Sequence, residues 1–186
     1  MVNRRVLWGS LGVAAIVIVA STIYFLESPP PPSSTVKMLL LPGDIGANWK
    51  AQITDKPYVL LPDDHYFDNV TSYSKVTLWN GTDEYTYQVE VWLVHWKDST
   101  NANHAFEYVF GQYQGQNLTK VNSTIGDRTF LFHDQSYDIY MDFIDGNVEC
   151  WLHCQNYQDW GRPWWVDTTI LIAQLQLEKI DRYLAG

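Results

Sequence analysis

Hydrophobic residues along the chain form one long uninterrupted run and a series of shorter, periodic stretches. The long run covers residues 6–26, which include no charged side chain, and Arg4 and Arg5 precede it. About twenty residues at roughly 1.5 Å each span the hydrocarbon core of a bilayer, and basic residues stay on its cytoplasmic side. The pattern predicts a basic cytoplasmic tail at 1–5 and an uncleaved transmembrane signal anchor at 6–26, with the remaining chain extracytoplasmic. A signal peptide cleaved near Ala20 is the alternative.

The residues directly after this run are rich in proline and serine. Residues 27–36 contain four consecutive prolines, followed by two serines and a threonine. Consecutive prolines favour the extended polyproline II helix, which does not collapse onto a neighbouring surface. We therefore expect a stalk, or an ordinary linker, that separates the membrane from a domain at 37–186.

Periodicity within this domain predicts two amphipathic helices and several strands. Their order is that of an α+β domain, in which an antiparallel sheet is covered by two helices on one face, a two-layer sandwich. Residues 36–61 carry mixed signals that favour neither strand nor helix. The predicted elements are strands at 75–79 and 85–96, a helix from Asp98 to Gly115, a short strand at 130–132, a hairpin of strands at 137–144 and 148–154, and a helix from Pro163 to Leu184.

The charge of the chain excludes one class of partner. Twelve Lys and Arg residues against twenty-one Asp and Glu residues give a formal net charge of −9. A strongly acidic surface repels the phosphate backbone of nucleic acids. We expect no nucleic-acid partner.

Sequons for N-glycosylation agree with an extracytoplasmic domain. All of them fall in predicted loops or at predicted strand ends, where a glycan is accessible. Unmodified polar turns are the alternative interpretation. The four sequon asparagines are Asn69, Asn80, Asn117 and Asn122.

Three short motifs are spread along the domain in order: Leu39 to Gly46 with Trp49, Ile125-Gly126-Asp127, and Asp145-Gly146-Asn147-Val148. Together they resemble small exported, membrane-anchored α+β domains of PsbP-like type and related proteins of unknown function. The resemblance implies a sheet that binds a ligand or partner outside the membrane, often as an accessory to a larger membrane assembly. It implies no active-site residue.

The two cysteines lie in one predicted strand. Cys150 and Cys154 share a face of that strand, roughly 13 Å apart, whereas a disulfide requires Cα atoms within about 7 Å. We expect two buried free thiols. A disulfide made possible by a local turn, and a metal site that adds His153, are the alternatives.

The polar face of the predicted hairpin at 137–154 presents four side chains that can bind metals: Asp138, Asp142, Glu149 and His153. With a turn at 145–146, Asp142 lies opposite Glu149, and this like-charge pair favours a bound cation such as calcium. With a turn at 146–147, Asp142 lies opposite Trp151 and the reason for a cation disappears. Acids that are simply solvated are the alternative, and no other cofactor is expected.

Exposed tryptophans are the remaining candidates for ligand binding. Trp160, Trp164 and Trp165 gather where the last predicted helix begins. Indole rings stack on sugars when they are exposed, and fill the core when they are not. Trp92 and Trp96 share one face of their strand, as part of an aromatic platform or of a second buried layer.

Sequence motifs for catalysis are absent. The chain has no Gly-x-Ser-x-Gly elbow, no phosphate-binding glycine loop and no pair of histidines at helical metal-ligand spacing. We therefore expect a membrane-anchored extracytoplasmic binding or interaction module, possible partners being a cell-envelope protein or a glycan. A carbohydrate-binding module that uses the three tryptophans is the first alternative. A hydrolase built on Asp138, Glu149 and His153 is the second.

Overall fold

A computed structural model describes residues 34–55, 69–80, 87–134, 138–155 and 164–186 of the chain. The chain divides into two compact units, Met1–Pro31 and Pro32–Gly186, and all described residues belong to the second unit. The predicted anchor at 6–26 lies outside the described residues. Among the helices that are described, none is both long and apolar enough to cross a membrane.

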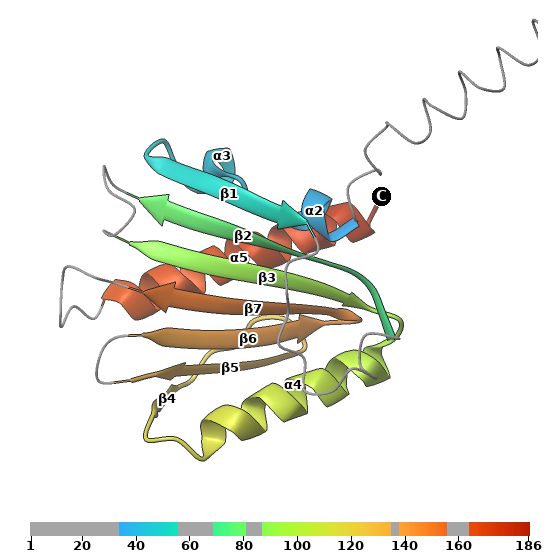
Figure 1. Cartoon of the computed structure of the whole chain (residues 1–186), viewed down its shortest axis with the longest axis vertical. Helices are drawn as coiled ribbons and strands as arrows, with labels where there is room; N and C mark the ends of the chain where they lie inside the picture. Colours follow the sequence, from blue (N-terminus) through green and yellow to red (C-terminus); the bar gives the residue numbers. More distant parts are fainter. Residues whose placement is uncertain (1–33, 56–68, 81–86, 135–137, 156–163) are drawn as a thin grey trace, which may run out of the picture. The chain divides into compact units, whose positions relative to one another are not determined.

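The second unit is an α+β domain built on a seven-stranded antiparallel sheet (Figure 1). The strand order is β1-β2-β3-β7-β6-β5-β4, so the central pair, β3 and β7, joins segments that are distant in the sequence. The elements are α2 (Ser34–Met38), α3 (Pro42–Ile45), β1 (Trp49–Asp55), β2 (Val70–Asn80), β3 (Gln88–Trp96), α4 (Ser99–Gln114), β4 (Thr119–Val121), β5 (Arg128–His133), β6 (Ile139–Asp145), β7 (Val148–Gln155) and α5 (Trp164–Leu184).

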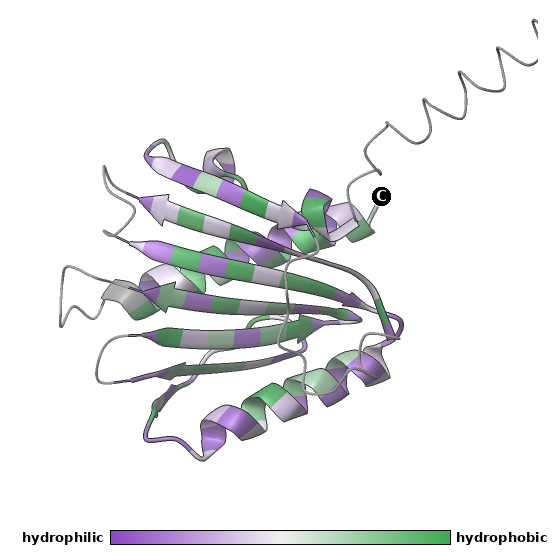
Figure 2. Ribbon diagram, viewed as in Figure 1, coloured by the Kyte–Doolittle hydropathy of each residue, from purple (hydrophilic) through white to green (hydrophobic). Residues whose placement is uncertain are grey.

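The larger core lies between the sheet and α5, which runs behind the sheet in Figure 1. Hydrophobic and hydrophilic residues alternate along the strands (Figure 2), because successive side chains of a strand point to opposite faces. In β3, Val89, Val91 and Leu93 are fully buried on the α5 side. Ile172 and Ala173 of α5 pack in the same core. This surface is the α5 face of the sheet.

A second core lies on the opposite face of the sheet, against α4. Phe130 alternates with Leu131 in β5, and it packs with Trp96, Ala105 and Phe106 rather than with the α5 core. The expectation that both helices cover one face is therefore wrong. The physical reason is that these strands are apolar on both faces where α4 lies, so each face needs a helix. We call this surface the α4 face.

The helix caps and turns follow the sequence signals. Asp98 caps α4 by accepting a hydrogen bond from the Asn101 N–H at 2.9 Å, which confirms the predicted helix start. The turn between β6 and β7 is at 146–147, and Asp145 pairs with Val148. The predicted hairpins between β2 and β3 and between β6 and β7 are confirmed.

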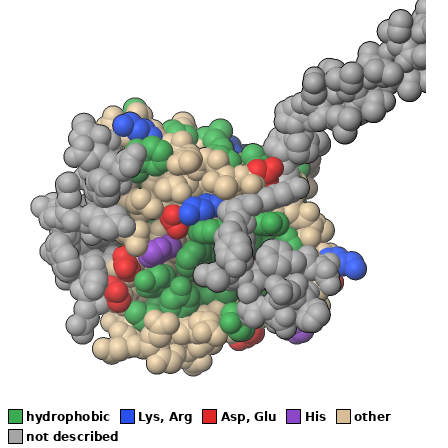
Figure 3. Space-filling model, viewed as in Figure 1, with side chains coloured by type: hydrophobic (Ala, Val, Ile, Leu, Met, Phe, Trp, Pro, Cys, Tyr) green, Lys and Arg blue, Asp and Glu red, His purple; other side chains and the backbone are tan. Residues whose placement is uncertain are grey.

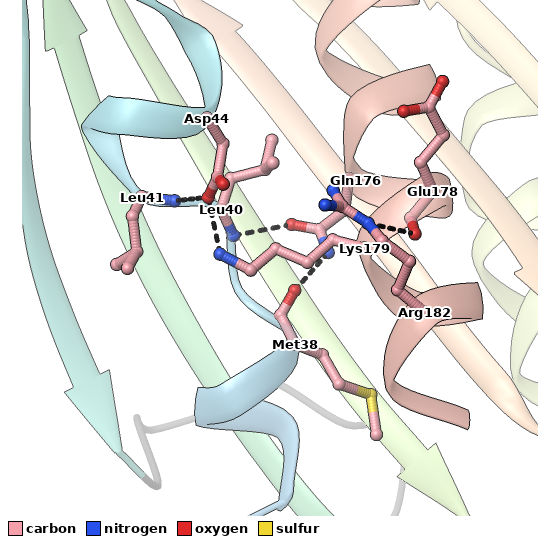
Figure 4. A network of polar contacts seen from close by, with 8 residues as sticks. All are labelled: Met38, Leu40, Leu41, Asp44, Gln176, Glu178, Lys179 and Arg182. Carbon is pink, nitrogen blue, oxygen red and sulfur yellow. Dashed lines mark hydrogen bonds and ion pairs between the residues drawn. The ribbon is translucent and has the colours of Figure 1, made fainter. Parts of the chain in front are cut away.

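Residues 34–46 are clamped onto α5 by a buried glutamine (Figure 4). Gln176 accepts a hydrogen bond from the Leu40 N–H at 3.1 Å and donates one to the Met38 carbonyl at 2.7 Å. Next to it, Lys179 forms an ion pair with Asp44. Thr35 is also fully buried, so ordered packing already begins inside the segment 27–36 that the composition assigned to a stalk.

Replacing Gln176 by leucine is expected to lower the free energy of unfolding by about 2 kcal/mol, measured by urea denaturation. Leucine fills a similar volume but leaves the Leu40 N–H and the Met38 carbonyl buried without partners. Gln174→Leu is the matched control, because Gln174 is an exposed glutamine on the same helix. Equal losses in the two variants would contradict the role of the clamp.

Candidate binding surface

Five ring-bearing side chains form a continuous group on the α4 face of the sheet. Strand register places Trp92 opposite Trp151 and His153 opposite Tyr140, and Tyr113 reaches them from α4. All five side chains are half-buried. We call this group the aromatic patch. Figure 3 shows hydrophobic side chains gathered on this side of the molecule, with a histidine and charged side chains at their margin.

In the aromatic patch, each ring contacts the next one in space, and the row of rings crosses three strands and a helix. Ring centroids are 5.9 Å apart for Trp92 and Trp151, and again 5.9 Å for Trp151 and His153. The His153 and Tyr140 rings are stacked at 4.8 Å, and so are the Tyr140 and Tyr113 rings. Such mutual contacts hold each ring in place, so the surface is organised before any ligand arrives.

Charged groups border the patch on two sides. Lys75 pairs with Glu90, and its ammonium lies 4.6 Å from the centroid of the Trp92 ring. On the other side, Asp138 Oδ1 lies 3.9 Å from His153 Nε2. Burial lowers the pKa of His153 and raises that of Asp138. The imidazole is therefore neutral at neutral pH.

Two polar atoms of the patch lack a hydrogen-bond partner among the described residues. Trp92 Nε1 and His153 Nε2 are buried without a hydrogen-bond partner anywhere in the described part of the chain, whereas the side chain of Trp151 interacts with that of Tyr113. A buried donor that is left unpaired costs about 1 to 3 kcal/mol, and most such groups in native proteins are satisfied. A ligand or partner group that reaches these atoms would remove that cost, while the ring faces supply apolar contact.

The four predicted metal-binding residues are divided between two places. His153 belongs to the patch and Asp138 borders it, whereas Asp142 and Glu149 are buried in the sheet. Asp142 lies opposite Trp151, which is the register that gives no reason for a cation. No three His, Cys, Asp or Glu side chains within the described residues are arranged to hold a metal ion.

The buried carboxyl pair of Asp142 and Glu149 is stabilised without a bound cation. Trp96 Nε1 donates a hydrogen bond to Glu149 Oε2 at 2.9 Å, and the carboxyl groups of Asp142 and Glu149 are joined by a side-chain hydrogen bond. Burial raises the pKa of Glu149 to about 7, and burial together with the nearby Glu149 raises the pKa of Asp142 well above its usual range. A proton that stays on the pair at neutral pH removes the like-charge repulsion without a cation.

The cysteines are both free and buried on the α5 face of β7. The two cysteines form no disulfide, because they are four residues apart in one extended strand and their Cα atoms are too distant for the bond. Thr169 on α5 donates a hydrogen bond to Cys154 Sγ at 3.2 Å. His153 points to the other face, so it forms no site with the two thiols.

The tryptophans predicted to bind a ligand are placed only in part. Trp160 lies outside the described residues, and Trp164 and Trp165 lie in the first turn of α5, with side chains outside the description. Trp96 belongs to the buried core against α4, whereas Trp92 belongs to the aromatic patch. Sequence reasoning missed the partners of Trp92. The signal was present in the alternation of β7, which places Trp151 and His153 on one face, but the register that joins them to Trp92 is not local.

The sequon asparagines all lie at the margins of elements. Asn69 directly precedes β2, Asn80 is the last residue of β2, and both are half-buried, while Asn117 and Asn122 flank β4 and are exposed. Modification of any of them stays a prediction.

Comparison with known proteins identifies a fold and no family. No family model and no curated protein matches the chain. The fold is similar to that of the extracellular domain of PknH from Mycobacterium tuberculosis, with a TM-score of 0.53 and 11% sequence identity. The match covers 78% of this chain and 93% of that one. The resemblance to PsbP-like domains stays a prediction, and the chain is an α+β domain with the fold of a known extracellular domain.

Proposed function

We propose that this chain is a single-pass membrane protein whose extracytoplasmic domain binds a cell-envelope protein through the aromatic patch. The observation that carries the proposal is the patch itself, where ordered ring faces surround two buried polar atoms that have no hydrogen-bond partner among the described residues. Interfaces between proteins are enriched in Trp and Tyr, and paired rings of this kind are typical of their energetically dominant centres.

The remainder of the chain supports the same architecture. The apolar run at 6–26 is long enough to anchor the chain, and residues 27–36 are suited to hold the domain away from the bilayer. A domain of related fold is an extracellular domain in PknH. These features favour an accessory or receptor role over an enzymatic one.

The test is site-specific photo-cross-linking of the full chain in native membranes. A benzophenone amino acid replaces Thr77. This residue lies on the α4 face and pairs with Glu90 in the β2–β3 register. The same group at Leu171, an exposed residue of α5, reports on the other side of the domain. We expect a cross-linked polypeptide from position 77 and none from position 171. Products of equal yield from both positions, or from 171 alone, would refute the patch as the interface.

Replacing Trp92 by alanine is expected to reduce the cross-linking yield at position 77 at least tenfold, because a central Trp at an interface contributes about 2 kcal/mol or more to binding. Trp92 is half-buried, so the domain should stay folded, as judged by its circular dichroism spectrum. An unchanged yield in a folded Trp92→Ala variant would count against the proposal.

Glycan binding is the second candidate, and the indole rings of the patch favour it. Trp92 and Trp151 present ring surface, and the Trp92 N–H has no hydrogen-bond partner among the described residues, a combination that suits the apolar and hydroxyl faces of a sugar. The same cross-linking experiment distinguishes the two candidates. A product at position 77 that is removed by glycosidase digestion, and contains no second polypeptide, supports the glycan.

A further inference from the structure

The first strand of the domain forms one edge of the sheet (Figure 1). β1 pairs with β2 on one side and with no described strand on the other. An unpaired edge is a template for a further strand, and most proteins protect it with a short strand, a proline or a bulge. The opposite edge is β4, which has only three residues. β1 has seven residues, no proline and an unbroken register with β2, so it lacks this protection.

The hydrogen-bond pattern shows which backbone groups of β1 point outward. Trp49 donates its N–H to the Gly46 carbonyl, and its β2 partner Asn80 donates its own N–H to a carbonyl on the β3 side. Trp49 and Asn80 therefore exchange no hydrogen bonds. Bonded and non-bonded pairs alternate between antiparallel strands, so Ala51 and Ile53 also direct their backbone groups outward. These groups have no strand, turn or loop partner among the described residues.

The same edge carries an exposed apolar side chain. Ile53 is 40% exposed, although Val76, its partner in β2 on the same face, is fully buried. Ala51 lies on this face as well and packs against the core beneath α5. The α5 core thus reaches β1 and ends there, and a further strand would extend it over Ile53.

We infer that β1 pairs with β1 of a second copy of this chain, antiparallel and related by a two-fold axis. One register pairs all seven residues of the strand, and it places Gln52 opposite its counterpart in the other copy. Ala51 of each copy then lies opposite Ile53 of the other. The outward backbone groups of these two residues are therefore the ones that exchange hydrogen bonds across the axis.

The side chains of β1 are complementary to one another in this register. On the α5 face, Ala51 meets Ile53 on both sides of the axis, so the exposed Ile53 is covered by an apolar group. On the α4 face, Lys50 meets Thr54. Lys50 and Asp55 are the only charged residues of the strand, and no like charges lie opposite each other. This self-complementarity, typical of two-fold interfaces, assigns the edge to a second copy rather than to an unrelated strand.

Disulfide formation at the axis tests the pairing in the full chain in native membranes. Gln52→Cys places two thiols at a non-hydrogen-bonded pair, where Cα atoms are about 4.5 Å apart, within the range of about 4.4 to 6.8 Å that a disulfide allows. Lys50→Cys is the matched control. It is exposed on the same face of the same strand, but the two copies of residue 50 lie roughly 13 Å apart along the strands.

After mild oxidation, we expect the Gln52→Cys chain to shift to a dimer on a non-reducing gel. The Lys50→Cys chain and the wild type should stay monomeric, since Cys150 and Cys154 are buried. A monomeric Gln52→Cys chain, equal dimer yields from the two variants, or a disulfide-linked product that contains another polypeptide would overturn the inference.

A second pair of variants tests the backbone hydrogen bonds. Ile53→Pro in the Gln52→Cys chain is expected to abolish the dimer, because it removes an outward N–H that the pairing with β2 does not use. Ile53→Val keeps this N–H and should keep the dimer. Circular dichroism checks that both variants are folded. Persistence of the dimer in a folded Ile53→Pro chain would also overturn the inference.

This interface uses the outer edge of β1 and not the aromatic patch. The product expected at position 77 contains a second kind of polypeptide, whereas the disulfide-linked product contains two copies of one chain. Failure of either test therefore leaves the other proposal standing.

Discussion

The Gly126→Ala variant is expected to lose about 3 to 5 kcal/mol of the free energy of unfolding. Gly126 has a φ of 64°, in the left-handed region that an L-residue adopts only with strain. A Cβ at this position would lie 2.4 Å from the Ile144 carbonyl oxygen, a backbone atom that cannot rotate away. The approach is this close because the next residue, Asp127, donates its N–H to the same oxygen at 2.8 Å.

Gly146→Ala is the matched control for this experiment. Gly146 also has a positive φ, 58°, but no atom lies within 4 Å of a Cβ built there. It should lose only about 1 to 2 kcal/mol, the cost of the left-handed backbone. Urea denaturation of both variants separates the clash from the backbone strain. Equal losses would mean that the domain accommodates the new methyl group by a local shift.

The two glycine turns also show how far the sequence predicts the fold. Each motif indicates a turn by itself, since Gly next to Asp or Asn is typical of left-handed positions. Only the structure shows that they touch, through the hydrogen bond from the Gly146 N–H to Asp127 Oδ2 at 2.9 Å. Turn chemistry is local and readable, whereas contact between turns depends on the complete sheet.

Strands were predictable where one face is buried and the other is not. The alternation of β3 and the hairpin of β6 with β7 follow from their side chains. β1 gave no such signal, because it lies at the sheet edge with most of its residues exposed. β4 has only three residues, too few for a period to be visible.

The placement of α4 and the assembly of the aromatic patch are global properties. An amphipathic stripe shows that a helix is buried on one side, and does not show which face of a sheet it covers. Phe130 and Leu131 are both buried, on opposite faces, and such a continuous apolar stretch suits either choice. In the same way, Trp92 was a candidate from its own strand, but its contact with Trp151 depends on the pairing of β3 with β7.

Raising the pH from about 5 to 8 is expected to destabilise the domain by about 2 to 3 kcal/mol through the buried carboxyl of Glu149. Its pKa is raised to about 7 in the folded domain, above the ordinary value of 4.5, because the carboxyl is buried. An acid with a raised pKa binds its proton more tightly when folded. Its stabilising contribution is therefore complete below the ordinary pKa and is lost as the pH rises through the folded one.

Asp142 adds to the same trend. It is fully buried next to Glu149, and its pKa is raised well above the ordinary value by burial and by the neighbouring carboxyl. Ionising the second member of the pair places two negative charges in one apolar site, so the domain should lose stability more steeply above neutral pH. Most globular proteins gain stability from acid to neutral pH as their paired carboxyls ionise, and this pair opposes that gain.

Urea denaturation at a series of pH values measures the effect, and two double variants isolate it. Asp142→Asn combined with Glu149→Gln replaces each acid by a neutral group of the same shape, so the loss of stability between pH 5 and 8 should largely disappear. Asp167→Asn combined with Glu178→Gln removes the same number of acids from exposed positions of α5, and should keep the wild-type dependence. If the buried double variant still lost stability with the wild-type slope, the pair would not be its source.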